Sequence, residues 1–265
     1  MSSADVSRVT REANESPVVE WGARVGYAVL GVLHLVIAYL AVKIAWGIGS
    51  SGSQSADQSG ALSTVAGSTT GPFLLWVAVV GFALLGLWNL TEGAISHGEV
   101  TDRLKLAAKG VMYLFFAWTA FKVVALGSNG SSEKDTEDAT QVLMGSPAGQ
   151  VLVGALGLVV LGIAGYHVYK GWKKKFLGDL TEHPGDWAVQ AGRAGYVAKG
   201  VALVVVGVFF LVAAVQHDAD KAQGLDGALK SLKDMAGGPV VLTVVALGIA
   251  AYGVYSFARA RYARL

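Results

Sequence analysis

One histidine lies inside a long apolar stretch. His34 follows Arg24 by ten residues, which at 1.5 Å per residue places it about 15 Å along a helix, close to the midplane of a bilayer. An ionisable side chain at that depth is costly and marks a candidate site for a proton or solute path. The alternative, which we favour, is a neutral histidine that is hydrogen-bonded across a helix interface to Tyr113 or Asn89.

Two lysines and a glutamate form a second polar group nearer one end of the apolar stretches. Lys109 and Lys199 each follow an arginine by six residues, and Asn89 and Glu92 fall at a similar depth. An ion pair of Glu92 with either lysine would neutralise a charge inside the membrane. The favoured alternative is that both lysines extend to the headgroups and Glu92 is hydrated. The candidate intramembrane polar site therefore comprises His34, Tyr113, Lys109, Lys199, Glu92 and Asn89.

The sequence holds no set of residues that suits catalysis. It contains no Cys, which excludes disulfides, thiol nucleophiles and thiolate metal sites. His34 and His167 fall at different depths and are a poor pair of haem ligands, and no two His are spaced for a metal on one helix face. We expect no catalytic residue, cofactor or metal, and a protein that is not an enzyme.

Composition indicates a polytopic membrane protein. Apolar residues make up 53% of the 265 residues and charged residues 15%, whereas an ordinary soluble domain is about 25% charged. The mean hydropathy is +0.50. A net charge of +2 gives no sign of a nucleic-acid partner, so the lipid bilayer is the expected surrounding.

Six segments are long and apolar enough to cross the hydrocarbon core, which takes about 20 residues. The third is the weakest, because only the residues between Lys109 and Lys122 are free of charge. The six predicted spans are 25–46, 72–91, 110–126, 148–169, 195–216 and 239–257. Aromatic residues near span ends are interpreted as interfacial, namely Tyr166, Tyr169, Tyr252, Tyr255 and Trp88.

The distribution of basic residues predicts the orientation of the spans. Fifteen Lys and Arg lie in the termini and the even-numbered loops, and six lie on the opposite side. By the positive-inside rule both termini are cytoplasmic, and the loops at 47–71, 127–147 and 217–238 face outward. Residues 1–20 are predicted to be a disordered cytoplasmic tail. The run Lys173 to Lys175 is interpreted as part of this signal, with a short interfacial helix on the anionic inner leaflet as the alternative.

A two-helix unit occurs three times in the chain. The motif that opens the first span is Arg24, Gly26, Tyr27 and Gly31. It recurs almost unchanged at the fifth span, as Arg193, Gly195, Tyr196 and Gly200, and loosely at the third span, as Arg103 and Gly110. The even spans open with a proline and carry two glycines five residues apart, as Pro72, Gly81 and Gly86, as Pro147, Gly157 and Gly162, and as Pro239, Gly248 and Gly253. Lys199 and Lys109 occupy one repeat position, and His34, Tyr113 and Leu203 another.

The repeats are assigned to 21–93, 103–171 and 193–261. A short apolar motif precedes each proline, so each outer loop is expected to contain an amphipathic turn or helix. A unit of two crossings returns to its starting side, so all three units share one orientation. The predicted fold is an all-α integral membrane protein with six transmembrane helices, as three parallel helical-hairpin repeats in a pseudo-threefold bundle. Glycines five apart face different sides, so each even helix is expected to pack closely on two sides.

The chain resembles the bacterial membrane family known only as domain of unknown function 1206. The resemblance rests on the threefold Gly-Tyr/Lys-Gly pattern of the odd spans and the glycine-rich even spans, from about Trp21 to Arg261. The second copy departs, with Lys105 and Leu106 in place of Gly and Tyr. The resemblance implies an integral protein of the bacterial inner (plasma) membrane, and it implies no activity.

Two functions from different classes are consistent with these observations. The first is a non-enzymatic protein that acts by helix packing with a membrane-protein partner or by self-association, as the many small residues favour. The second is a carrier or channel for a small solute or proton along the pseudo-threefold axis, lined by the candidate polar residues. A water-lined cavity at His34 would favour the second.

Overall fold

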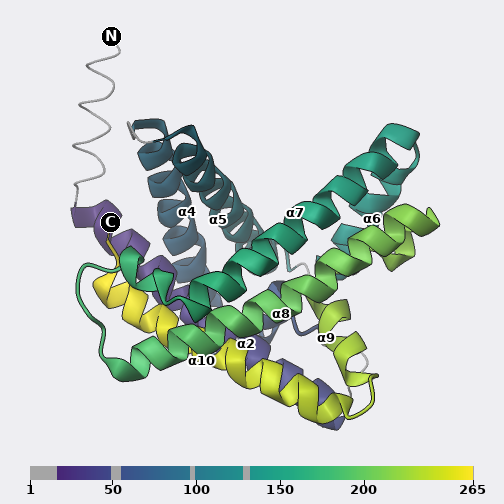
Figure 1. The fold of residues 1–265 in the computed structure, drawn as a ribbon. Helices are drawn as coiled ribbons and strands as arrows, with labels where there is room; N and C mark the ends of the chain where they lie inside the picture. The colour runs from purple at the N-terminus through teal and green to yellow at the C-terminus, as the bar shows by residue number, and fades with distance from the viewer. Residues whose placement is uncertain (1–16, 49–54, 96–98, 128–131, 265) are drawn as a thin grey trace. The chain divides into compact units, whose positions relative to one another are not determined.

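Six long helices dominate the structure. The computed structural model describes residues 17–48, 55–95, 99–127 and 132–264, and these contain helices and no β-strand. The long helices are α2 (Pro17–Trp46), α4 (Gly71–Ile95), α5 (Val100–Leu126), α7 (Pro147–Trp172), α8 (Asp186–Gln216) and α10 (Gly238–Tyr262) (Figure 1). Each is long and apolar enough to cross a membrane, which confirms the all-α, six-span prediction.

The predicted boundaries fit better at one end of each odd span than at the other. Helices α2, α5 and α8 end at Trp46, Leu126 and Gln216, as predicted, but all three begin several residues earlier than the apolar runs. Apolarity marks only the part of a helix that lies in hydrocarbon, and the helix continues through the polar interface. Residues 17–20 are helical and do not belong to the predicted disordered tail, whose first 16 residues lie outside the described ranges.

A short helix precedes each even span, as the apolar loop motifs predicted. These helices are α3 (Gln58–Ala66), α6 (Ser132–Met144) and α9 (Leu225–Lys233), and the 3₁₀-helix η2 (Ala219–Lys221) leads into α9. Leu62 in α3 and Leu229 in α9 are buried, whereas Val142 in α6 is 82% exposed. A leucine of the apolar motif is therefore buried in the loop helices of the first and third repeats, whereas Val142 of the second repeat is exposed.

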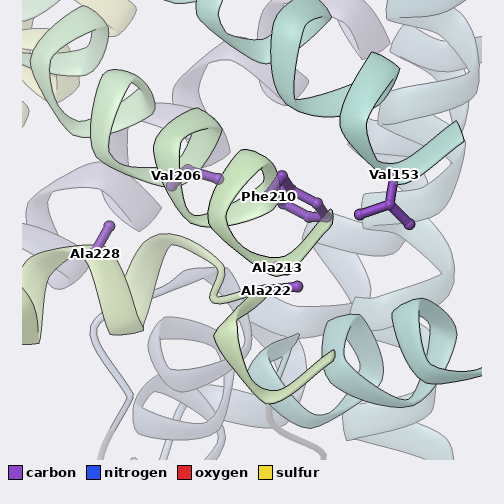
Figure 2. Close-up of a cluster of buried hydrophobic side chains, with 6 residues drawn as sticks. All are labelled: Val153, Val206, Phe210, Ala213, Ala222 and Ala228. Carbon is purple, nitrogen blue, oxygen red and sulfur yellow. The ribbon is translucent and has the colours of Figure 1, made fainter. Parts of the chain in front are cut away.

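The chain forms two compact units, and α2 and α10 contribute to both. Unit 1 comprises Met1–Leu30, Val65–Ser128 and Ser256–Leu265, and unit 2 comprises Gly31–Thr64 and Asn129–Tyr255. In unit 1, α4 and α5 lie side by side, and in unit 2, α7 and α8 do so (Figure 1). Figure 2 shows a buried cluster at which α7, α8 and α9 meet, made of Val153, Val206, Phe210, Ala213, Ala222 and Ala228.

Each even helix contacts the odd helix of the next repeat through small residues at one repeat position. In unit 1, a Cβ atom added at Gly110 would lie 2.9 Å from the carbonyl oxygen of Gly86. In unit 2, the corresponding distances are 2.8 Å from Gly200 to the Ala164 oxygen and 2.8 Å from Gly253 to the Gly31 oxygen. Such backbone contact requires small residues.

These contacts confirm the repeat but correct its alignment in the second copy. The contacts show that Ala164, and not Gly162, is the residue of α7 that corresponds to Gly86 and Gly253. Gly162 is exposed, and no atom would lie within 4 Å of a Cβ added there. The expectation that Gly162 packs closely is therefore wrong. The proline that opens α7 is three residues out of register with the other two, because it lies 17 residues before Ala164 whereas Pro72 and Pro239 lie 14 residues before Gly86 and Gly253. The prolines and the five-residue glycine spacing therefore gave a wrong alignment of α7.

In two of the three copies, the repeated arginine binds carbonyl groups near the end of the neighbouring helix, whereas Arg193 of the third copy donates a hydrogen bond to Gln190 of its own helix at 3.4 Å. Arg24 donates a hydrogen bond to the carbonyl oxygen of Ala260 near the end of α10, at 3.1 Å, and Arg103 donates to that of Gly93 near the end of α4, at 3.1 Å. The last carbonyl groups of a helix lack partners within the helix, and a cation there also suits the helix dipole. In these two copies the arginine thus joins the end of one repeat to the start of the next.

Candidate intramembrane polar site

His34 and Lys199 contact the same side chain, Tyr252 of α10, in unit 2. The His34 ring centroid lies 4.8 Å from that of Tyr252, with the planes tilted by 50°, and His34 is only 7% exposed. The Lys199 ammonium lies 4.1 Å from the Tyr252 ring centroid, within the range of a cation–π interaction. Two of the six candidate residues therefore meet at a tyrosine that was not among the candidates.

The glycine of the repeated motif allows Tyr252 to lie there. A Cβ atom added at Gly195 of α8 would be 2.5 Å from the Tyr252 Cα atom, so the two helix backbones touch at this crossing. Tyr252 is 5% exposed as a result. In unit 1 the matching Gly26 contacts α4 in the same way, because its Cβ would lie 2.8 Å from the Gly81 oxygen.

Tyr252 belongs to a buried aromatic cluster. Its ring lies 5.2 Å from that of Tyr196, Phe176 stacks on Tyr196 at 5.4 Å, and Tyr255 meets Phe176 edge to face at 5.0 Å. The Tyr255 hydroxyl donates a hydrogen bond to the Phe176 carbonyl oxygen at 3.3 Å. Phe176 comes from the 3₁₀-helix η1 (Lys175–Asp179), in the connector between α7 and α8, so this connector is anchored in the cluster.

The interfacial interpretation of the aromatic residues is wrong for three of the five. Tyr252, Tyr255 and Trp88 are 5%, 0% and 8% exposed, whereas Tyr166 and Tyr169 are 49% and 44% exposed and fit the expectation. A tyrosine near the end of an apolar span can face either lipid or a neighbouring helix. Spacing in the sequence does not distinguish the two.

A cation lies over the motif tyrosine in two of the three repeats. In unit 1, Arg259 lies over the Tyr27 ring at 4.3 Å and donates a hydrogen bond to its hydroxyl at 3.1 Å. In unit 2, Lys170 lies 5.3 Å from the Tyr196 ring centroid and forms an ion pair of 2.6 Å with Asp179.

The contact between the first and second repeats departs at both of these positions together. Arg259 and Lys170 each follow the equivalent residues Gly253 and Ala164 by six residues, and the residue six after Gly86 is Glu92. The motif tyrosine is likewise replaced, by Leu106. The ring and its cation are thus lost together. The Tyr27–Arg259 and Tyr196–Lys170 pairs could have been found from the sequence only after the register of α7 had been corrected.

The other four candidate residues lie in unit 1. Tyr113 is 5% exposed and stacks on Phe82 at 6.3 Å, and the amide of Asn89 donates a hydrogen bond to the Leu85 oxygen of its own helix at 2.8 Å. Glu92 is half-buried on α4 and Lys109 is exposed on α5. The hydrogen bond of His34 to Tyr113 or Asn89, and the pairing of Glu92, stay predictions.

Within the ranges that the structure describes, no group of three or more His, Asp and Glu side chains is arranged to hold a metal ion. A groove of about 320 Å³ between α2 and α4 in unit 1 is lined by apolar residues and glycine, among them Gly22, Val25 and Trp76. Its lining offers no side chain for acid–base chemistry, and in a bilayer such a surface suits an acyl chain.

Comparison with known proteins gives the same repeat. The model of the family described as Domain of Unknown Function (DUF1206) matches residues 25–96, 104–174 and 194–263. These ends reproduce the corrected register of α7. A protein of Bacillus subtilis (strain 168), named Uncharacterized protein YxxB, is 25% identical over 269 residues, which cover 97% of this chain and 95% of the relative. No solved structure matches the chain significantly.

Proposed function

The chain belongs to the family described as Domain of Unknown Function (DUF1206), and we propose that it is a non-enzymatic, multi-pass protein of the bacterial plasma membrane. In this proposal it acts by helix packing, with a membrane-protein partner or with a second copy of itself. Both termini are cytoplasmic, as the basic residues of the termini and even-numbered loops indicate.

The observation that carries the proposal is that polar side chains of the spans are used in packing. His34 and Lys199 lie against Tyr252, and Arg259 lies against Tyr27. A carrier site needs polar groups that face water or a solute. Contacts with buried aromatic rings instead join one helix to another.

Helix α7 offers a surface for a partner helix. Of the six spans it is the least buried, and Val151 and Leu158 on it are 73% and 62% exposed. Gly162 and Gly165 on the same helix have no atom within 4 Å of where a Cβ would stand. Small residues on an exposed apolar helix allow a second helix to approach closely.

Cross-linking tests this surface. The chain contains no Cys, so Leu158→Cys is the sole thiol of its variant, and oxidation of native membranes should give a product of higher mass that denaturing gels resolve. Val153→Cys is the matched control, because Val153 on the same helix is fully buried. Mass spectrometry of the product distinguishes a second copy from another protein. Equal cross-linking of both variants, or of neither, contradicts the proposed surface.

The carrier function is the second candidate, because two titratable side chains, His34 and Lys199, lie against the ring of Tyr252. Flux through purified protein in liposomes decides between the two functions. The packing proposal predicts proton and solute leakage no faster than in protein-free liposomes. A pH-dependent flux in the wild type that His34→Leu abolishes, with unchanged stability, would establish the carrier instead.

A further inference from the structure

The connector between α7 and α8 is an addition to the repeat. Residues 175–193 separate the second and third family matches, whereas only residues 97–103 separate the first and second. The longer connector is firmly attached to unit 2, since Phe176 is fully buried and Leu180 is 3% exposed. Its Asp179 is paired with Lys170 of α7 at 2.6 Å. A segment so attached holds its exposed side chains at a fixed place.

Those exposed side chains include a run of cations beside an aromatic residue. Trp172, at the last position of α7, is 68% exposed, and Lys173, Lys174 and Lys175 follow it, all exposed. Lys174 has a φ of 54°, in the left-handed region, so the backbone turns sharply there. The run therefore lies at the exact end of the span, where lipid headgroups begin.

The lysines differ in how they are used within the protein. The Lys175 ammonium lies 4.8 Å from the Tyr169 ring centroid, and a hydrogen bond with Tyr169 raises the pKa of Lys175. For Lys173 and Lys174 the described part of the chain shows no ion pair. The acids of the connector are Asp179, which Lys170 neutralises, and the exposed Glu182 and Asp186 further along the chain.

We propose that Lys173 and Lys174, with Trp172 beside them, bind the phosphate of an anionic phospholipid headgroup. An exposed tryptophan at a span end is suited to the headgroup depth, and adjacent ammonium groups attract the phosphate of an anionic lipid. The assignment of this headgroup to the cytoplasmic leaflet rests on the proposed orientation. The binding itself does not, because it depends only on the local arrangement of the connector.

Spin-labelled lipids measure the binding directly. The 265-residue chain is placed in nanodiscs of phosphatidylcholine, and electron paramagnetic resonance gives the protein-bound fraction of labelled phosphatidylglycerol relative to labelled phosphatidylcholine. Both leaflets have the same composition, so the result is independent of orientation. We expect the wild type to prefer phosphatidylglycerol. The preference should fall about fivefold in Lys173→Gln and about fivefold again in Lys173→Gln/Lys174→Gln. It should also weaken in high salt.

Two further variants keep the test specific. Lys173→Arg/Lys174→Arg retains both charges and should retain the preference. Lys221→Gln/Lys233→Gln removes two lysines that lie after the C-terminal end of α8, at the ends of η2 and α9. This variant should also retain the lipid preference. Circular dichroism melting confirms that each variant is folded before its lipid preference is compared.

Several results would overturn the proposal. These are a wild type without preference, a double glutamine variant that keeps it, or a loss in the Lys221 and Lys233 control as large as in the connector variant. Competition by glycerol phosphate in solution, with the same lysine dependence, would show that the ligand is a soluble phosphate rather than a lipid. Labelling of Lys174→Cys from outside intact cells would refute the proposed orientation alone and leave the lipid result standing.

Discussion

Replacing Gly253 by Ala tests the contact that joins consecutive repeats. The new Cβ would lie 2.8 Å from the Gly31 oxygen and 3.1 Å from the Leu35 Cγ atom, so the two helices must separate slightly. Overpacking of a close contact costs about 1 to 3 kcal/mol. The higher helix preference of Ala offsets at most about 1 kcal/mol, and we expect a net loss of about 1 to 2 kcal/mol.

Gly162→Ala is the matched control for this substitution. It makes the same chemical change inside another even helix, but at a position where no atom lies within 4 Å of the new Cβ. We expect this variant to unfold at the wild-type temperature or slightly above it. Gly47→Leu would be a poor control, because Gly47 has a φ of +63° and any side chain is strained there.

Thermal unfolding in detergent, followed by circular dichroism, compares the two variants. About 2 to 4 °C of Tm per kcal/mol is typical for a chain of this size, so Gly253→Ala should melt several degrees below Gly162→Ala. Equal melting temperatures would refute the reasoning. They would mean that the Gly31 contact is not close, or that it contributes nothing to stability.

Three further substitutions test other parts of the structure. Arg259→Leu removes the cation over Tyr27 and should lower the free energy of unfolding by about 1 to 2 kcal/mol, and Arg259→Lys should restore part of it. Asp226→Ala should cost about 1 to 3 kcal/mol, because the 1% exposed Asp226 carboxylate accepts a 2.7 Å hydrogen bond from the Ala56 backbone. A cysteine at Glu137 in α6 should react with a membrane-impermeant maleimide in spheroplasts, since this loop is expected to face outward.

Each of these has a result that contradicts it. Arg259→Lys no more stable than Arg259→Leu would show that charge over the ring is unimportant. Asp218→Ala removes an exposed ion pair of 4.0 Å and an exposed 3.1 Å hydrogen bond that Asp218 accepts from the Asp220 backbone, and it should cost at most about 1 kcal/mol. An equal cost for both aspartates would argue against a special role for Asp226. Labelling at residue 137 only after lysis would place the loop inside.

The number of spans and the threefold repeat could be predicted because both depend on local composition. A span is defined by its apolar length, and the repeat by motifs such as Arg24 to Gly31 that recur without gaps. The contacts of Arg24 and Gly26 explain why this motif recurs, since one binds the end of a neighbouring helix and the other allows close approach. The placement of the three hairpins about a common axis remains a prediction.

The candidate site was harder to predict, because it depends on which face of each helix is covered. His34 and Lys199 are recognised by their charge and depth. Tyr252, which contacts both, is a tyrosine near the end of a span and therefore resembles an interfacial residue in sequence. The register of α7 was missed for a different reason. Pro147 suits the first turn of a helix wherever that turn begins, so it marks a helix start and not a repeat position.

The most direct test of the account is the coupling between His34 and Tyr252. The free energies of unfolding of the wild type, His34→Leu, Tyr252→Leu and the double variant form a thermodynamic cycle. If His34 serves helix packing, the two substitutions should be non-additive by about 0.5 to 1.5 kcal/mol, the range found for aromatic contacts and interhelical hydrogen bonds. Additive effects, with His34→Leu as stable as the wild type, would contradict the claim that the intramembrane histidine holds the helices together.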